Sequence, residues 1–255
     1  MTAYQLEING VAVTAYYPEE DIRKVYLPLL EEWSALQKET GRRIIVFIAA
    51  PAGCGKSTLA AFLAQLAQNH GIAGVQALGM DGFHCPQKFL DTHTAVLEGK
   101  EVPLAQIKGH PLTFDVPKLQ AALEALKHND IAWPYYSRQI HDPIENAIPV
   151  TGSIILLEGN YLLYEEEPWD RLSEYCDASL FLRMDEEVLL NRIIERKIRT
   201  GRSEEEAVRT VYGSDRRNNQ LVLNHSRTAD HEIVLSPGNQ IISVRSAAKP
   251  GRQGV

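Results

Sequence analysis

The sequence predicts an α/β fold in which a parallel β-sheet is covered by helices on both faces. Two continuous apolar runs, residues 153–158 and 178–184, have the composition of parallel strands that are buried on both sides. A third run, the β-branched segment 44–50, is followed at once by an Ala- and Leu-rich helical pattern over 56–69. Strands that alternate with helices in this way are typical of parallel sheets. With 44% hydrophobic residues, the chain can bury a large core, and we expect one domain with insertions.

The first 43 residues are a predicted extension ahead of this sheet. Two strand-like segments, YQLEI and VAVTAYY, flank an Asn-Gly dipeptide that is typical of a two-residue hairpin turn. Residues 20–40 then show the apolar periodicity of an amphipathic helix, which we expect Pro28 to interrupt and kink and Gly41 to end. No residue pattern in this extension indicates catalysis. We expect it to cover an edge of the fold or to make a dimer contact.

The middle of the chain is less regular. A strand is expected near 74–80, which would complete a strand–helix–strand unit. Residues 84–113 have an irregular pattern, with a short helix expected around 86–98. Residues 131–140 are strand-like, but Pro134 argues against a central position in the sheet, because proline cannot donate to a strand ladder.

Three further helices are predicted from residues suited to capping a helix N-terminus. These capping residues are Asp115, Asp185 and Ser203, the last of which forms a capping box with Glu206. A last strand is expected over 231–236. The main domain then spans 44–238, and residues 239–255 form a C-terminal tail whose end, AAKPGRQGV, has a flexible composition.

The segment between the strand 44–50 and its helix is a glycine-rich loop with the order Gly-x-Gly-Lys-Ser. This strand–loop–helix context is typical of a P-loop that binds a nucleoside triphosphate, and it makes the predicted fold one of P-loop NTPase type. The glycines let backbone N–H groups converge on phosphates at the positive end of the helix. The usual first glycine is here Ala50, and an ordinary glycine turn is the alternative interpretation.

Each residue of the loop has a predicted role in binding ATP. Lys56 would reach the terminal phosphates, and the hydroxyl of Ser57 would bind Mg²⁺. Cys54 would contribute its backbone N–H and not its thiol. The nucleotide-binding residues that we predict in this loop are Gly53, Cys54, Gly55, Lys56, Ser57 and Thr58.

Two acidic residues are predicted at the carboxyl ends of strands, where ligands of parallel sheets gather. Asp81 follows the strand 74–80 and could accept a proton from a substrate hydroxyl that attacks the γ-phosphate. Glu158 ends the apolar run 153–158, and a carboxylate there is costly to bury unless a cation such as Mg²⁺ accompanies it. The alternative for both is a carboxylate that only caps a turn.

The helix that begins at Asp185 carries arginines on one face, Arg192, Arg196 and Arg199, and Arg202 follows it. Such a helix could close over ATP as a lid and neutralise charge on the transferred phosphoryl group. However, residues 183–217 hold nine basic and eight acidic residues, so a solvated helix with many ion pairs is an equally good interpretation.

Five motifs resemble, in this order, the pantothenate kinase/uridine kinase/phosphoribulokinase superfamily, and above all a bacterial subgroup described as nucleoside- or fructose-kinase-like. The motifs are AAPAGCGKST, MDGFHCP, IKGHPLTFDV, PYYSRQIHDP and IILLEGNYLL, and the resemblance covers about residues 42–236. It implies a kinase that uses ATP and Mg²⁺ to phosphorylate a hydroxyl of a small metabolite, a sugar or a nucleoside before others.

The resemblance also implies roles for single residues. Asp81 would be the general base, Lys56 and Arg196 would stabilise the transferred phosphoryl group, and Ser57 and Glu158 would lie at Mg²⁺. Arg192 and Arg196 would contact ATP from a lid over 185–215, and the insertion 84–113 would cap the substrate. The implied substrate-binding residues are Asp81, His84, Lys108, His110, Tyr136 and Arg138.

Two other function classes remain open. One is a P-loop ATPase or nucleotide sensor that has no metabolite acceptor, although such a protein has no need of a base at Asp81. The other is a kinase for an acceptor that bears a carboxylate or phosphate, such as pantothenate or glycerate. A GTPase is disfavoured because the sequence lacks an NKxD motif, and a transporter ATPase because it lacks an LSGGQ-like signature.

Composition bounds the partners and the compartment. The net charge of −7 argues against non-specific binding to nucleic acid or to an anionic membrane. The N-terminal residues lack the features of a signal peptide, and no apolar run is long enough to span a membrane. Three cysteines cannot pair completely, which favours a reducing compartment. We therefore expect a cytoplasmic protein with a small-molecule partner, and a homodimer is left open.

Overall fold

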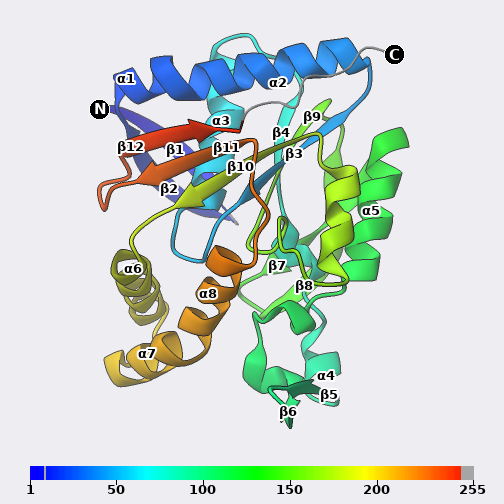
Figure 1. Cartoon of the computed structure of the whole chain (residues 1–255), viewed down its shortest axis with the longest axis vertical. Coiled ribbons are helices and arrows are strands. Elements are labelled where there is room, and N and C mark those ends of the chain that lie inside the picture. The colour runs from blue at the N-terminus through cyan, green and yellow to red at the C-terminus, as the bar shows by residue number, and fades with distance from the viewer. Residues whose placement is uncertain (9, 248–255) are drawn as a thin grey trace.

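The centre of the computed structural model, which describes residues 1–8 and 10–247, is a six-stranded sheet (Figure 1). Its strand order is β12-β11-β10-β3-β9-β4. Five of these strands are parallel, and β12 runs antiparallel to β11 at one edge. The strands are β3 (Ile44–Ala49), β4 (Val75–Gly79), β9 (Ile154–Gly159), β10 (Ala178–Arg183), β11 (His231–Leu235) and β12 (Ile241–Ser246).

The two faces of the sheet pack into two separate cores, as the alternation of side chains along β3 shows. Ile44, Val46 and Ile48 point into one core, together with α2 (Leu27–Thr40) and α3 (Lys56–Asn69). Ile45 and Phe47 point into the other, together with α5 (Val116–His128). All five side chains are fully buried. The predicted parallel sheet with helices on both faces is confirmed.

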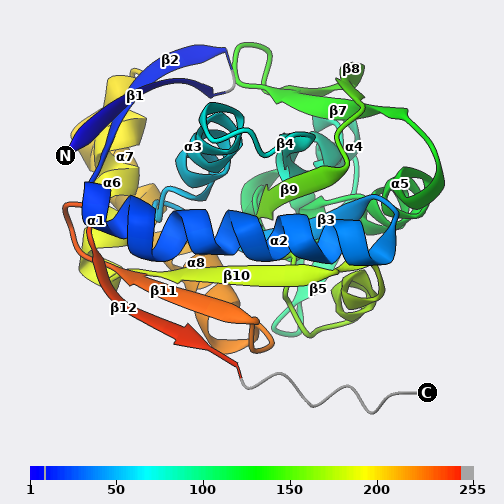
Figure 2. The ribbon, with the colours of Figure 1, turned by 90° about the horizontal axis from the view of Figure 1, so that it is seen from above.

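The N-terminal extension folds as a hairpin followed by a long helical segment. Strands β1 (Thr2–Ile8) and β2 (Val11–Tyr17) pair antiparallel, and Figure 2 shows them beside α3. α1 (Glu19–Asp21), a π-helical turn over Ile22–Tyr26 and α2 then follow without a break, and α2 ends at Gly41 with a left-handed backbone (φ 64°). The interruption expected at Pro28 takes the form of this π-helical turn, which ends two residues before Pro28 in the first turn of α2.

The irregular insertion differs from its prediction. Of the helix expected over 86–98, only Gln87–Leu90 (α4) is helical. The segment beyond forms a hairpin of β5 (Thr94–Leu97) and β6 (Lys100–Pro103). Its turn residues Glu98 (φ 52°) and Gly99 (φ 76°) have left-handed backbone, which no helix can contain. Two 3-10 turns, Leu104–Ile107 (η3) and Pro111–Thr113 (η4), lead on to α5.

A second hairpin lies outside the main sheet. It pairs β7 (Ile131–Ser137) with β8 (Asp142–Val150), a strand that the sequence analysis did not predict. Pro134 lies where the register of this pair shifts, between Trp133 and Tyr135, so the argument against a central strand is confirmed.

The C-terminal third carries helices whose predicted caps are present. The Asp185 carboxylate accepts hydrogen bonds from the backbone at the start of α6 (Glu186–Arg199), and the Ser203 hydroxyl accepts one from Glu206 N at the start of α7 (Glu204–Thr210). A π-helical turn, η6 (Val211–Asp215), connects α7 to α8 (Arg216–Asn224), and a 3-10 segment, η5 (Trp169–Tyr175), precedes β10.

The boundary of the predicted C-terminal tail needs correction. Residues 241–246 are not a tail but form β12, which pairs with β11 because its apolar residues alternate and can cover the edge of the sheet. The segment 248–255, which we expected to be flexible, lies outside the described residues.

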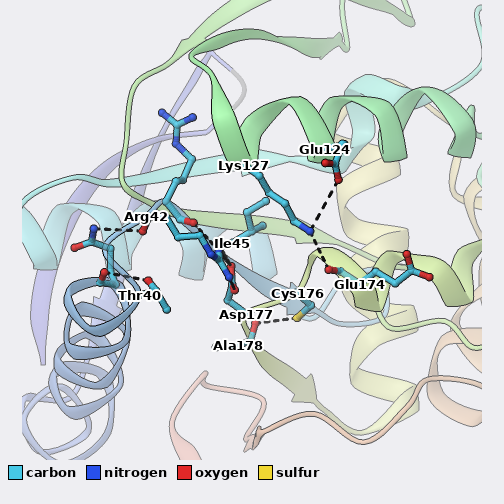
Figure 3. Close-up of polar contacts among 11 residues, drawn as sticks. Thr40, Arg42, Ile45, Glu124, Lys127, Glu174, Cys176, Asp177 and Ala178 are labelled. Carbon is cyan, nitrogen blue, oxygen red and sulfur yellow. Dashed lines mark hydrogen bonds and ion pairs between the residues drawn. The ribbon is translucent and has the colours of Figure 1, made fainter. Parts of the chain in front are cut away.

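Polar contacts fix the amino ends of β3 and β10 at the end of the sheet opposite the glycine-rich loop (Figure 3). The guanidinium of Arg42 donates to both carboxylate oxygens of Asp177, at 2.5 and 3.1 Å. One of these oxygens also accepts a hydrogen bond from Ile45 N at 2.9 Å. Nearby, Lys127 Nζ donates to the carbonyl oxygen of Glu174 at 3.1 Å, which ties α5 to η5. These contacts hold the strand from which the loop emerges.

Candidate active site

The phosphate-binding loop, residues 50–57, joins β3 to α3. Gly53 (φ 87°) and Gly55 (φ 91°) both have left-handed backbone, which side chains rarely adopt. A Cβ at Gly53 would also lie 2.8 Å from the carbonyl oxygen of Leu189 in α6, so this close approach requires glycine. α3 begins at Lys56, directly after the second glycine. The loop therefore has the backbone needed to direct N–H groups toward an anion in front of a helix.

Two residues at the loop are not part of the usual P-loop motif. Ala50, in place of the usual first glycine, is fully buried in the core, and its φ is not positive, so an alanine fits there without strain. Asn219 of α8 is 1% exposed, and its side-chain amide accepts from Ala52 N (2.8 Å) and donates to Ala52 O (3.2 Å). Sequence reasoning missed Asn219; the one available signal was an Asn-Asn pair, poor helix formers, within a helical segment.

Glu158 lies beside the loop because β9 pairs in parallel with β3. It ends β9 and is 8% exposed. Its Oε1 accepts a hydrogen bond from the Ser57 hydroxyl at 2.8 Å, and its Oε2 lies 4.0 Å from Lys56 Nζ. Burial raises the pKa of the Glu158 carboxyl, and the positive charge of Lys56 opposes that rise. The structure therefore brings together the lysine, hydroxyl and carboxylate that the sequence predicted at one place.

These oxygens fit a magnesium ion that arrives with a triphosphate. A hydroxyl and a carboxylate are the hard oxygen ligands that Mg²⁺ prefers, and the buried carboxylate lacks enough positive charge to hold its pKa at the ordinary value. Within residues 1–8 and 10–247, no group of three His, Cys, Asp or Glu side chains could hold a metal by itself. Mg²⁺ commonly takes one or two protein ligands and completes its shell with water and phosphate oxygens.

Asp81 leaves the sheet next to Glu158. It lies in η2 (Met80–Phe83), a 3-10 turn that directly follows β4, and β4 pairs with β9 so that Gly79 faces Glu158 in register. A Cβ at Gly82 would lie 2.3 Å from the carbonyl oxygen of Pro134, so this glycine allows η2 to rest against the irregular part of β7. The Trp133 indole also donates to Gly79 O at 2.8 Å. Two neighbouring residues of β7 thus hold the turn that carries Asp81.

The charge of Asp81 acts on groups from three different elements. It adds to burial in raising the pKa of Tyr136 to about 12, and it adds to burial in raising the pKa of Glu158. Burial and the charge of Arg138 lower the pKa of Arg196 in α6, while Asp215 and Asp81 oppose this change. Asp81, Glu158, Tyr136, Arg138 and Arg196 therefore share one electrostatic site.

His84 lies next to this group. Its ring stacks on Phe114 with 3.9 Å between ring centres and lies 5.1 Å from the ring of Tyr136. The backbone pairs His84 with Phe114, so the DGF and TFD motifs lie side by side. Burial lowers the pKa of His84 although Asp81 opposes this, so the ring is neutral at pH 7. Its Nδ1 is buried and has no hydrogen-bond partner among the described residues.

The structure places the other two expected substrate residues differently. Lys108 Nζ donates to Gln87 Oε1 (2.7 Å) and to His141 O (2.9 Å), and it lies 5.5 Å from the centre of the Tyr136 ring. Lys108 thus links the insertion to the turn of the β7–β8 hairpin. His110 accepts a hydrogen bond from Leu112 N at 3.3 Å. Burial and, to a lesser extent, the charge of Arg217 in α8 lower the pKa of His110. Among the described residues, His110 makes no hydrogen bond or ion pair with Asp81.

The arginines of the predicted lid divide into two kinds. Arg192 donates to Gly53 O (3.3 Å) in the phosphate-binding loop and to Pro237 O (2.7 Å) and Asn239 Oδ1 (2.8 Å) in the turn between β11 and β12. Arg196 also keeps contact with solvent, and its charge interacts with the charges of Arg138, Asp215 and Asp81. Arg199 and Arg202 are exposed and bond to their own helical segments, so for them the solvated interpretation fits better.

The cysteines are not reactive groups of this site. Burial raises the pKa of the Cys54 thiol to about 12, although Lys56 and Arg192 oppose the rise, so the thiol is neutral at pH 7. Burial raises the pKa of Cys176 to about 12 as well. Cys54, Cys85 and Cys176 form no disulfide. Among the described residues there is also no helix that is both apolar and long enough to cross a membrane.

Comparison with known proteins gives a family match over most of the chain. The model of the phosphoribulokinase/uridine kinase family matches residues 45–239. This stretch includes every residue that the site described above uses.

Individual relatives agree with that match. The chain is 40% identical over 234 residues to "Uncharacterized protein YggC" of Escherichia coli K12, which covers 91% of this chain and 95% of that protein. It is 30% identical over 202 residues to "Putative uridine kinase C227.14" of Schizosaccharomyces pombe, over 76% and 83% of the two chains. Among solved structures, a "putative fructose transport system kinase" from Silicibacter sp. TM1040 superposes with a TM-score of 0.67 at 28% identity, over 78% of this chain and 97% of that one.

Proposed function

Because this chain belongs to the phosphoribulokinase/uridine kinase family, a family of ATP-binding P-loop kinases, we propose that it transfers the γ-phosphoryl group of ATP to a hydroxyl of a neutral sugar or nucleoside. The observation that carries the proposal is the position of Asp81. It leaves β4 beside Glu158, which in turn bonds to Ser57 of the phosphate-binding loop. A carboxylate at that place has a use in phosphoryl transfer to an acceptor and none in nucleotide sensing.

In the proposed reaction, the acceptor hydroxyl attacks the γ-phosphorus while its proton passes to the Asp81 carboxylate. The bond between the γ-phosphorus and the bridging oxygen breaks, and ADP leaves. Lys56 and the N–H groups of the loop bind the phosphates, and Arg196 neutralises charge that builds up on the transferred group. Arg138 carries a second positive charge to the same place.

Mg²⁺ would be held by Ser57 and Glu158 together with oxygens of the triphosphate, and it would supply neutralisation of phosphate charge. In its absence, the Ser57 hydroxyl and Lys56 are the groups that partner the Glu158 carboxylate. These contacts keep the two oxygen ligands near one another before the nucleotide binds.

The acceptor site favours a ligand with several hydroxyl groups. His84 has a buried Nδ1 that lacks a partner among the described residues, and Tyr136 offers a phenol that stays protonated because its pKa is raised to about 12. Both are neutral at pH 7 and suit hydrogen bonds to hydroxyls. The names of two relatives, "Putative uridine kinase C227.14" and a "putative fructose transport system kinase", refer to neutral acceptors of this kind for those proteins.

A panel of acceptors tests the proposal. The purified protein is incubated with ATP, Mg²⁺ and single members of a set of sugars, nucleosides, pantothenate and glycerate, and the products are separated by mass spectrometry. We expect a phosphorylated sugar or nucleoside, and the Lys56→Ala variant serves as the inactive control. Slow ATP hydrolysis alone, equal with and without every acceptor, would favour the ATPase or sensor and overturn the proposal.

Arg138→Ala distinguishes a neutral acceptor from an anionic one. An acceptor with a carboxylate or phosphate would lose a charge-assisted contact, and its KM would rise by about tenfold or more. For a neutral acceptor we expect KM to change by less than about threefold, because neutral contacts are weaker by about half. A strong preference for an anionic acceptor that disappears in this variant would favour the pantothenate- or glycerate-type kinase.

The unpaired cysteines support a reducing compartment, and we propose that the enzyme is cytoplasmic, where ATP and small metabolites are both present.

A further inference from the structure

A cavity of about 420 Å³ lies at the side of the phosphate-binding loop. Part of its wall comes from the loop and the first turns of α3, through Gly55 and Thr58. These residues flank Lys56 and Ser57, so the cavity begins where the phosphate site ends. Since a nucleoside extends from the phosphate chain on such a side, this cavity is suited to the rest of the nucleotide.

The opposite wall is the N-terminal hairpin, which has no part in the proposed chemistry. Residues 13–17 of β2 line the cavity. On the inner face of this strand, Ala15 and Tyr17 pack into the core, and Tyr17 stacks on Phe62 of α3 with 3.6 Å between ring centres. Val13 is partly buried on the same face and lines the cavity. The hairpin is thus fixed to α3 at one end and faces open space further along.

β2 also brings an unpaired strand edge. It pairs with β1 on one side, and within residues 1–8 and 10–247 no other strand pairs with it. The free edge of a strand presents backbone N–H and C=O groups in alternation. A nucleobase edge presents a donor and an acceptor side by side, so such a strand edge can bond to it.

The Arg192 side chain also lines the cavity, and hydrogen bonds fix its orientation. Its guanidinium is held by three hydrogen bonds, to Gly53 O, Pro237 O and Asn239 Oδ1, and it lines the cavity. A planar guanidinium that is held in place can stack on an aromatic ring. Cys54, also in the lining, presents a neutral thiol. Apolar, stacking and strand-edge groups therefore face one space.

We propose that the N-terminal hairpin forms a specificity-determining wall of the nucleobase pocket, with Val13 against the base and the free edge of β2 along it. The inference rests on the proposed function, because it requires that a nucleoside triphosphate occupies the phosphate-binding loop. It gives the extension 1–43 a role in choosing the nucleotide, whereas the acceptor site lies with Asp81.

Val13→Trp tests this role, with Ala12→Trp as its matched control. Ala12 is exposed and does not line the cavity, so its variant adds the same bulk to the same strand outside the cavity. Binding of MgATP and of magnesium tripolyphosphate, which has a phosphate chain but no base, is measured by calorimetry. We expect Val13→Trp to weaken MgATP at least about tenfold, the scale of losing one base-stacking contact, and to leave tripolyphosphate within about twofold. Ala12→Trp should change neither.

Two results would overturn the proposal. One is MgATP binding by Val13→Trp as tight as in the wild type, and the other is an equal loss of MgATP and tripolyphosphate, which would mean a disturbed loop. If Val13→Trp does not fold, hydrogen exchange on the wild-type protein decides: amides of residues 13–16 should be protected by MgATP and not by tripolyphosphate, and equal exchange contradicts the proposal. Tripolyphosphate binding without any MgATP binding would refute the hairpin role alone, whereas a wild type that binds neither would refute the proposed function with it.

Discussion

At the scale of single residues, Glu158 is a site residue that lowers the stability of the nucleotide-free protein. Its carboxylate ends a fully apolar strand, and burial raises its pKa more than Lys56 can offset. A raised pKa means that the ionised form is disfavoured in the folded state relative to the unfolded chain. The residue therefore destabilises the nucleotide-free protein at neutral pH, and we ascribe its presence to magnesium and phosphate binding.

Glu158→Gln should raise the stability of the nucleotide-free protein and lower its turnover. The amide keeps an oxygen that can accept from Ser57 but removes the charge, so we expect the melting temperature of the nucleotide-free protein to rise, on the order of 2–4 °C for about 1 kcal/mol in a chain of this size. Turnover with the acceptor should fall by about a hundredfold or more. A calorimetric scan and a steady-state assay of the same sample measure both effects.

The stability that Glu158→Gln gains over the wild type should depend on pH in one direction. Above the raised pKa the wild-type carboxylate is charged and costly, and as pH falls through that pKa it takes up a proton and the cost disappears. The stability advantage of Glu158→Gln should therefore be largest at neutral pH and shrink toward acid. An advantage that grew on acidification, or a destabilised variant at neutral pH, would contradict this account.

The residues of the site differ in how far the sequence could predict them. Lys56, Ser57 and Glu158 follow from local motifs, because a glycine-rich loop and an apolar strand that ends in an acid each fix the position of a side chain. The sequence names His84 among the substrate-binding residues, but the surroundings of His84, and any role of Asn219, could not be predicted in this way. The orphan Nδ1 of one and the bonds of the other to Ala52 depend on segments that are distant in the sequence.

At the scale of elements, the position of Asp81 depends on the fit of η2 against β7. Gly82 allows the backbones to approach, since a Cβ there would lie 2.3 Å from Pro134 O. The Pro134 irregularity in β7 and the bond from Trp133 to Gly79 complete the fit. The DGF motif therefore holds its glycine for contact with another element, and its aspartate for the site.

Gly82→Ala should disturb both the contact of η2 with β7 and the position of Asp81. Because the nearest atoms are backbone and cannot rotate away, we expect a loss of stability of about 1–3 kcal/mol, as for overpacked sites, and a clear fall in phosphoryl transfer. Gly213→Ala is the control, since a Cβ there meets nothing within 4 Å and the glycine lies in a helical turn. Urea titration and the transfer assay compare the two, and a Gly82→Ala variant as stable and active as Gly213→Ala would refute the fit.

Elements with a strong local period could be predicted, whereas those decided by pairing could not. The helix 56–69 and the strands around 44–50 and 154–159 matched the structure because burial on both faces leaves an unmistakable apolar pattern. The β5–β6 hairpin and β12 are short and half exposed, so their residues carry little periodicity. Their strands form because a partner is available in the fold.

At the scale of the whole molecule, the site residues and the stabilising polar contacts lie at opposite ends of the sheet. The phosphate-binding loop, Asp81 and Glu158 lie at the carboxyl ends of parallel strands, where ligands of such sheets bind. The amino ends carry structural contacts, of which the bonds of Asp177 to Arg42 and to Ile45 N are a clear case. Stability and catalysis should therefore be separable by mutation at opposite ends.

Asp177→Ala tests the separation. The change leaves Ile45 N and the Arg42 guanidinium without their acceptor, which should cost about 1–3 kcal/mol of unfolding free energy. The kcat/KM for the acceptor should stay within about twofold of wild type below the melting transition. Asp130→Ala, at an exposed partner of Arg43, is the control and should cost no more than about 1 kcal/mol. A large loss of kcat/KM in the folded Asp177→Ala variant would show that the two ends are coupled.

The account depends most on Asp81 as the base of a phosphoryl transfer, and Asp81→Asn measures that role directly. The amide keeps the shape of the side chain and removes its ability to take a proton. ATP binding is measured by calorimetry and transfer to the best acceptor of the panel by phosphorus NMR. We predict ATP affinity no weaker than in the wild type and transfer slower by about a hundredfold to ten-thousandfold. Transfer within about threefold of the wild-type rate would contradict the account and leave Asp81 a residue that only caps its turn.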